Sequence, residues 1–204
     1  MVWRRLWLVS CVVSALCLQL SEFGAVGAAE LDPHPHRWAW LKDSVWYVPA
    51  GGLTAVAASP DRGRVITLFD QTVYVIQGYR DGYFWGVTRV QFWPPQQGPV
   101  PPVSPPTCMR LLGSVTPEGA ITLSFTPVDS SGENTTGIGV MRQRDHAWTM
   151  ENQMISTATV MVGSTPRQVE IAHWAYMNAC PVNNTCPLPG ITADARQFIA
   201  ACIK

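Results

Sequence analysis

The chain has 204 residues and equal numbers of basic and acidic residues, fourteen of each, so its formal net charge is zero. A nucleic-acid-binding protein usually carries a basic excess on one face or in one run. Beyond Arg5, no two basic residues are adjacent. Nucleic acid and anionic membrane surfaces are therefore poor candidate partners.

Residues 1–29 have the three parts of a secretory signal peptide. Arg4 and Arg5 form the basic part, residues 6–20 are apolar, and residues 24–29 (GAVGAA) supply the small side chains that a signal peptidase requires. We expect cleavage after Ala29, or one or two residues earlier. The apolar part is shorter than the roughly twenty residues that span a bilayer. The sequence thus predicts Sec export to the periplasm or the medium, with no transmembrane segment.

A lipoprotein is the alternative, because residues 8–11 (LVSC) match a lipobox. Cleavage there would leave an apolar part of only about five residues, too short for export. We therefore expect one mature domain spanning residues 30–204. Removal of Arg4, Arg5 and Glu22 leaves twelve basic and thirteen acidic residues, a formal charge of −1.

Export leaves four cysteines: Cys108, Cys180, Cys186 and Cys202. An even number in an exported chain indicates two disulfides. A zinc site is disfavoured because the spacings contain no C-x2-C pair and no histidine at finger spacing. The short loop from Cys180 to Cys186 favours a bond between these two, with Cys108 bonded to Cys202. The pairs Cys186–Cys202 and Cys108–Cys180 are the competing connectivity.

The mature chain is rich in branched and aromatic segments separated by turn signals, a pattern typical of strands. Asp81-Gly82 predicts a two-residue type I′ turn, Asp145-His146 predicts another turn, and Asp70-Gln71 predicts a weaker one. Residues 94–106 hold seven prolines and predict an extended loop. We expect strands at residues 45–48, 64–69, 72–79, 83–92, 108–115, 120–125, 137–143 and 147–155, the last extended by 157–162.

The C-terminus follows a helical pattern instead. Ala195, Phe198, Ile199 and Cys202 recur at helical spacing, with Thr192 as the expected N-cap. Residues 168–178 fit two interpretations. A capping-box pattern favours a helix there, whereas alternating apolar residues favour a strand.

Many antiparallel strands with tight turns predict a closed barrel or a sandwich. The stretch LKDSVWY, residues 41–47, resembles the first-strand motif of lipocalins, in which a glycine precedes a tryptophan by two residues. Here Ser44 stands in the glycine position before Trp46. The resemblance implies an all-β, up-and-down barrel of about eight strands with a short C-terminal helix. It also implies that Trp46 closes one barrel end and that the protein binds ligands.

No catalytic constellation is found in the sequence. It has no G-x-S-x-G, Walker or G-x-G-x-x-G motif in a suitable context, and its cysteines are expected to be paired. Glu170 and His173 form a single E-x-x-H pattern, whereas di-iron bundles need two. The histidines His34 and His36 lie in a proline-containing terminus, where a loose metal contact is the weaker interpretation. We expect no catalytic residues, no metal site and no cofactor.

The stretch QGYRDGYFWGVTRVQFWPP, residues 77–95, holds six aromatic residues. A two-residue turn at Asp81-Gly82 predicts that Tyr79 opposes Phe84, Gln77 opposes Gly86, and Val73 opposes Val90. One face should then point inward, as core or pocket wall. Its candidate ligand-binding residues are Gln77, Tyr79, Phe84, Thr88 and Phe92. The other face offers candidate partner-binding residues: Tyr74, Trp85, Arg89 and Trp93.

Two functions follow as hypotheses. The first is an exported lipocalin-like protein that binds a small, largely apolar ligand. The second is an envelope or secreted interaction protein with a filled core, which binds a protein or glycan partner through its outer aromatic residues. Cavity volume discriminates between them, because a ligand site needs roughly 300 Å³ or more.

Overall fold

Antiparallel strands make up most of the computed structural model, which describes residues 36–49, 52–59, 62–93, 106–129, 134–162, 164–189 and 193–203. The expected signal peptide and the proline-rich residues 94–105 lie outside these ranges. The strands are β1 (Ser44–Tyr47), β2 (Gly52–Ser59), β3 (Arg62–Arg80), β4 (Tyr83–Trp93), β5 (Thr107–Val115), β6 (Ala120–Pro127), β7 (Thr135–Arg144), β8 (Ala147–Val162) and β9 (Thr165–Cys180).

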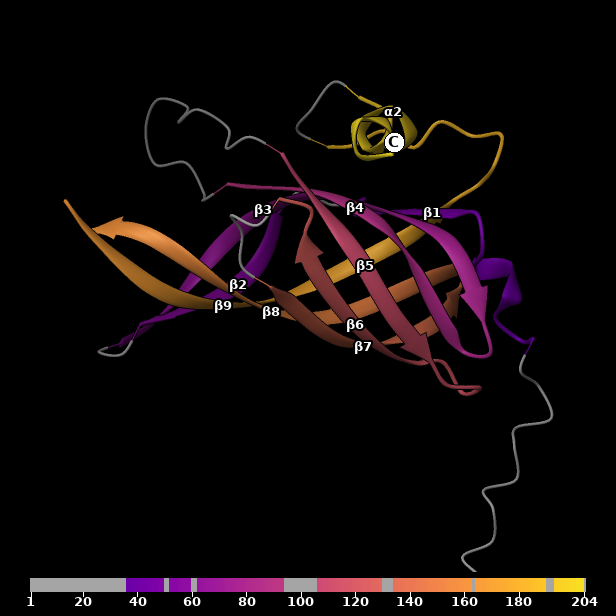
Figure 1. Ribbon diagram of the computed structural model, residues 1–204, viewed down its shortest axis with the longest axis horizontal. Helices are drawn as coiled ribbons and strands as arrows, with labels where there is room; N and C mark the ends of the chain where they lie inside the picture. Colours follow the sequence, from indigo (N-terminus) through magenta and orange to yellow (C-terminus); the bar gives the residue numbers. More distant parts are fainter. Residues whose placement is uncertain are drawn as a thin grey trace, which may run out of the picture. The chain divides into compact units, whose positions relative to one another are not determined.

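The sheet closes into a barrel of eight positions because β1 and β2 share one of them. Both lie between β3 and β9: β1 pairs with the C-terminal part of β3, and β2 pairs with its N-terminal part. From β3 to β9 each strand pairs with the next along the chain. This is the up-and-down barrel that the sequence predicts. The β2–β3 and β8–β9 hairpins continue beyond one end of it (Figure 1).

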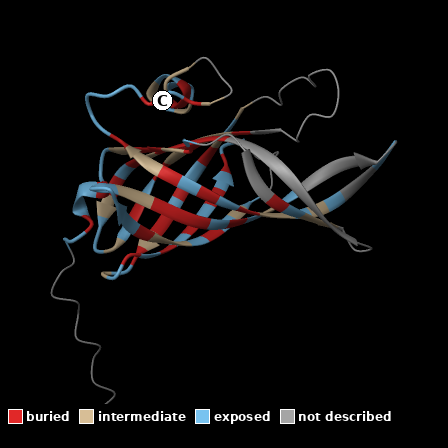
Figure 2. Cartoon of the chain, turned by 180° about the vertical axis from the view of Figure 1, so that it is seen from behind, coloured by how far each residue is buried: buried red, intermediate tan, exposed pale blue. Residues whose placement is uncertain are grey.

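Burial alternates along the strands, and the buried side chains form the core inside the barrel. In β6, exposed and buried residues alternate without interruption, as expected for a strand with one face on the core and one in water. The same alternation is visible on neighbouring strands (Figure 2). The inward residues form one hydrophobic cluster that includes Trp46, Tyr74, Phe84 and Phe125.

The structure corrects two expectations about the strands and decides a third. Asp70-Gln71 is not a turn, because β3 runs through it without a break. Residues 52–59 form β2, a strand that the sequence does not indicate, since this stretch is mostly glycine, alanine and serine. Residues 168–178 are strand rather than helix, because they pair with β8 along their whole length.

The Asp81-Gly82 turn forms as predicted, with positive φ at both residues, and Tyr79 opposes Phe84. A bulge between Ile76 and Gly78 then shifts the register by one residue. In the part of β3 that precedes the bulge, the side that faces the barrel interior is therefore the opposite of the predicted one.

The end of the barrel that carries the turns between β3 and β4, β5 and β6, and β7 and β8 is capped by the chain that precedes β1. A 3-10 helix, η2 (Ala39–Leu41), lies there. Trp38 donates its indole N–H to the Thr116 carbonyl oxygen over 2.8 Å. Trp46 is fully buried and donates its indole N–H to the Ser44 hydroxyl oxygen over 2.8 Å. The hydroxyl of Ser44 thus has a hydrogen-bonding role that a glycine could not supply.

The C-terminal segment packs on the outside of the barrel over β1, β3 and β4 (Figure 1). It contains α2 (Ala195–Ile199), followed directly by a 3-10 turn, η3 (Ala200–Cys202). Phe198 and Ile199 cover Val45 and Val73, which face outward from the sheet. The predicted helix is confirmed, but its N-cap is Asp194 rather than Thr192.

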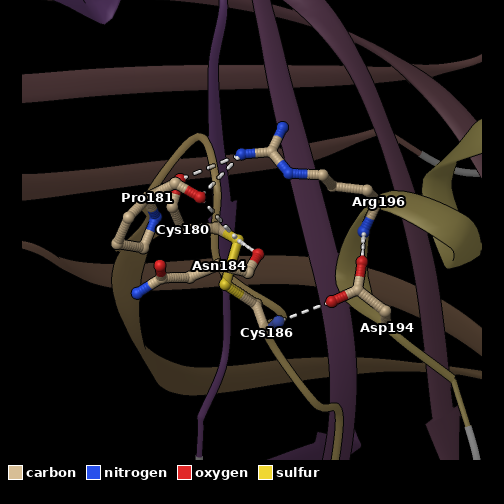
Figure 3. The surroundings of a disulfide bond; sticks show 6 residues. All are labelled: Cys180, Pro181, Asn184, Cys186, Asp194 and Arg196. Atoms are coloured by element: carbon tan, nitrogen blue, oxygen red, sulfur yellow. Dashed lines mark hydrogen bonds between the residues drawn. A yellow bond between two sulfur atoms is a disulfide. The ribbon is translucent and has the colours of Figure 1, made fainter.

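Two disulfides hold this segment, with the favoured connectivity: Cys108–Cys202 and Cys180–Cys186. Asp194 links the second disulfide loop to the helix by accepting backbone N–H groups from Cys186 and Arg196 (Figure 3). Burial acts to raise the pKa of Asp194, but these backbone N–H groups outweigh it and lower the pKa from its ordinary value. The described residues include no helix long and apolar enough to cross a membrane.

Candidate interaction surface

The barrel interior is filled by side chains. Five methionines point into it and are buried: Met109, Met141, Met150, Met154 and Met177. Large inward side chains also fit against inward glycines of the neighbouring strand. A carbon added at Gly113 would lie 2.3 Å from the Phe84 ring, and one added at Gly137 would lie 2.4 Å from the Met154 sulfur. This pairing of large and small residues leaves little free space.

One small cavity lies at the end of the barrel opposite the cap, which we call the loop end. Its volume is about 30 Å³. The residues around it are Thr72, Tyr74, Thr88, Val90, Met109, Phe125, Thr135, Met154, His173 and Ala175. This volume holds one or two water molecules and is about one tenth of what an organic ligand requires.

Three buried polar side chains lie near this cavity or one layer deeper. His173 lines it, and burial lowers the pKa of its imidazole from 6.5 to about 4. Thr88 also lines it, and its hydroxyl has no hydrogen-bond partner among the described residues. Asn152 is fully buried, directly opposite Ala175 on β9, and neither of its side-chain polar atoms has such a partner within those residues.

The predicted ligand-binding residues are divided by the structure. Phe84 and Thr88 are buried inside the barrel, and Tyr79 packs against the same core. The Tyr79 hydroxyl accepts the Gly82 backbone N–H over 3.1 Å and so belongs to the turn. Gln77 is exposed at the bulge, so its predicted inward position is wrong. The side chain of Phe92 lies outside the described residues.

The predicted partner-binding residues do not form one face either. Tyr74 is buried inside the barrel, because the bulge inverts this part of β3. Arg89 faces outward but lies under the C-terminal segment, where it donates to the Phe198 carbonyl oxygen and sits over the Phe198 ring. Trp85 is outward and about half exposed, and its ring covers Gly78. The side chain of Trp93 lies outside the described residues.

A different set of exposed apolar side chains gathers on the outside of β7, β8, β9 and β2. We call it the outer apolar face and define it by five residues, each with more than two fifths of its surface exposed: Val56, Ile138, Ile155, Trp174 and Tyr176. The Trp174 and Tyr176 rings lie 5.9 Å apart with their planes 18° from parallel, and together form a broad aromatic platform.

The strand register makes this face continuous. Ile155 lies opposite Ala172, which lies opposite Val56 on β2. In the next row Gln153 is flanked by Ile138 on one side and Trp174 on the other. Outward residues in adjacent rows and strands are close enough for long side chains to touch. The five residues therefore border one another through uncharged neighbours.

Charges stand at the margins of this face. Glu151, opposite Tyr176, is mostly buried and accepts from the guanidinium groups of Arg142, over 3.0 Å, and Arg144. Both arginines are more than half exposed. Glu170 is exposed beyond Ala172 on the far margin. The surface thus has an uncharged centre, a positive margin and a negative margin.

The sequence contains the residues of the outer apolar face but does not indicate that they lie side by side. A strand is suggested by Val169, Ile171, Trp174 and Tyr176. In that strand, Trp174 and Tyr176 point to the opposite side from His173, which is buried inside the barrel. Residues 168–178 also fit a helix by pattern, and Val56 lies in a strand without a clear signal. Only the pairing of β9 with β8 and β2 brings these side chains together.

Within the described ranges, no three His, Cys, Asp or Glu side chains gather in a way that could hold a metal ion. Glu170 and His173 lie on opposite faces of β9, the first exposed and the second buried, so the E-x-x-H pattern brings no site together. His146 is exposed in the β7–β8 turn with positive φ.

The barrel and its C-terminal helix are compatible with a lipocalin-like fold. Comparison with known proteins finds no matching protein-family model, no matching curated protein and no matching solved structure.

Proposed function

We propose that this chain is an exported interaction protein, a filled β-barrel that binds a protein partner through the outer apolar face. The signal-peptide pattern of residues 1–29 and the two disulfides support export. The observation that carries the proposal is the contrast between a filled interior and an exposed, continuous apolar surface. Exposed apolar patches rimmed by polar residues are typical of interaction sites.

The volume of the interior cavity argues against the predicted small ligand inside the barrel. A space of about 30 Å³ is too small for an organic ligand, and the side chains of the hydrophobic core occupy the rest of the interior. Admission of a ligand of 300 Å³ would require the core to repack. The outside of the barrel needs no such change to bind.

The surface chemistry fits a protein rather than another class of partner. Protein interfaces favour Tyr, Trp and Arg and have few charged residues at their centre, as in the outer apolar face and its arginine margin. Trp174 and Tyr176 offer a large rigid area, and Arg142 and Arg144 provide guanidinium groups beside it. We therefore expect a partner with an apolar patch and acidic residues next to it.

Site-specific photo-crosslinking in the producing cells identifies the partner. A photoreactive residue placed at Ile155 should crosslink one defined protein, and the same protein should appear from position 138. Leu112 provides a matched control, because it is also an outward aliphatic residue on a barrel strand, 58% exposed against 54% for Ile155. A photoreactive residue at position 112 should not yield that protein.

Binding of the purified partner then tests the face quantitatively. Ile155→Asp should weaken the dissociation constant at least tenfold, because it places an unpaired charge in an apolar contact. Leu112→Asp should change it less than twofold. Equal effects of the two variants would contradict the proposal. Binding of an oligosaccharide array that is lost in Trp174→Ala, without any protein crosslink, would replace the protein partner by a glycan.

A further inference from the structure

The cavity at the loop end of the barrel brings together side chains from strands far apart in the sequence. Met109 of β5, Met154 of β8 and His173 of β9 all line it. Met154 and His173 are direct cross-strand neighbours. The three residues are at least 94% buried. The side chains of two methionines and one histidine thus border a single space of about 30 Å³.

The remaining residues of the described lining are uncharged. Tyr74 and Phe125 contribute aromatic rings whose centres lie 5.2 Å apart. Three threonines and two small apolar residues complete the wall, so no carboxylate, ammonium, guanidinium or thiol belongs to the described lining.

The ligand types select the kind of ion. Calcium and magnesium need several oxygen ligands, usually including carboxylates. A structural zinc site is built from four Cys or His ligands, and only one His is present here. Thioether sulfur selects Cu(I), and imidazole also suits copper. The volume accommodates one ion, or one or two water molecules, but no larger group.

We propose that the loop end of the barrel binds one soft monovalent metal ion, Cu(I), through Met109, Met154 and His173. This site is separate from the outer apolar face and does not depend on the protein partner. The ion enters with its oxidation state unchanged, so binding requires no electron transfer.

Two buried methionines away from the cavity serve as controls for the role of methionine in plain core packing. Met141 and Met150 are also buried and inward but do not line the cavity. Replacement of Met by Leu at any of these positions removes the sulfur and nearly conserves volume. A metal site and a plain core therefore predict different patterns across the same kind of substitution.

The test titrates the mature, disulfide-bonded protein with Ag(I), a redox-inert probe for Cu(I), and with Cu(I) under anaerobic conditions against a chromogenic chelator. All proteins carry His34→Gln and His36→Gln, which removes the imidazoles near the mature N-terminus. Native mass spectrometry counts the bound ions, and far-UV circular dichroism confirms that each variant is folded.

We expect one ion per chain. Met109→Leu and Met154→Leu should each weaken binding at least tenfold, and His173→Gln should do the same. Met141→Leu and Met150→Leu should stay within twofold of the parent protein. The absence of a stoichiometric ion in the folded parent, or equal affinities in all four methionine variants, would overturn the proposal and leave water as the occupant of the cavity.

Discussion

The indole ring of Trp85 covers Gly78 on the neighbouring strand: a side-chain carbon added at Gly78 would lie 2.2 Å from the ring. Gly78→Ala should therefore displace the indole and lower the free energy of unfolding by about 1–3 kcal/mol. In the Trp85→Ala background the same substitution should cost much less, because alanine is otherwise preferred to glycine in a strand. Urea unfolding of the four proteins measures this coupling. An equal cost in both backgrounds would show that the ring is not held there.

Asn152 is an uncompensated polar group in an apolar core. Neither its amide nitrogen nor its carbonyl oxygen has a hydrogen-bond partner among the described residues, and an unsatisfied buried polar group costs about 1–3 kcal/mol. Asn152→Leu keeps the branching of the side chain and should raise the free energy of unfolding by a similar amount. Gln153→Leu, on the exposed neighbour, should change it by less than about 0.5 kcal/mol. A destabilised Asn152→Leu protein would contradict this account of the core.

The two disulfides should differ in their contribution to stability. Cys108–Cys202 closes a loop with a sequence separation of 94, against 6 for Cys180–Cys186. Chain entropy alone then gives about 5 kcal/mol for the first and about 2 kcal/mol for the second. Paired Cys→Ser variants compared by denaturant unfolding test this order. A greater loss from removal of the Cys180–Cys186 bond would contradict it.

His173 should make stability depend on pH in acid. Its pKa is about 4 in the folded protein and 6.5 in the unfolded chain, so the unfolded chain binds the extra proton between these values. The stabilisation is complete above pH 6.5 and is lost as the pH falls towards 4, by about 3 kcal/mol in total at 1.36 kcal/mol per pKa unit.

Among the described residues of the cavity wall there is no carboxylate, Lys or Arg that would alter this behaviour, and Tyr74 is the other titratable one. Unfolding of His173→Gln between pH 7 and pH 4 isolates the effect from that of the surface carboxylates. The variant should lose less stability than the parent over this range. Parallel curves for the two proteins would show that His173 is protonated equally in both states.

The sequence predicts the barrel class well because local rules act at each turn. The Asp81-Gly82 and Asp145-His146 turns have the positive φ values that their residues favour. The short loop between Cys180 and Cys186 predicts the disulfide between them. Eight of the nine strands are rich in branched or aromatic residues. β2 is mostly glycine, alanine and serine, and its strand conformation comes from pairing with β3 and β9.

The candidate site is far less accessible from sequence. A single-residue bulge after Ile76 inverts the inward side of β3, so that Tyr74 is a core residue and Val73 lies under the C-terminal helix. Gly78 lies at this bulge, but a glycine inside a strand can also mark a bend or a close approach, so the sequence does not fix the shift in register. Likewise, Ile138, Ile155 and Trp174 become neighbours only through the registers of β7, β8 and β9.

We propose that binding occurs on the outside of a filled barrel. The most direct test is native mass spectrometry of the protein purified from its own host. The spectrum should show a mature chain with two disulfides that carries no organic molecule, although one metal ion can accompany it. A protein partner retained by the parent should be lost in Ile155→Asp and kept in Leu112→Asp. A stoichiometric organic ligand of a few hundred daltons that survives in both variants would contradict the account.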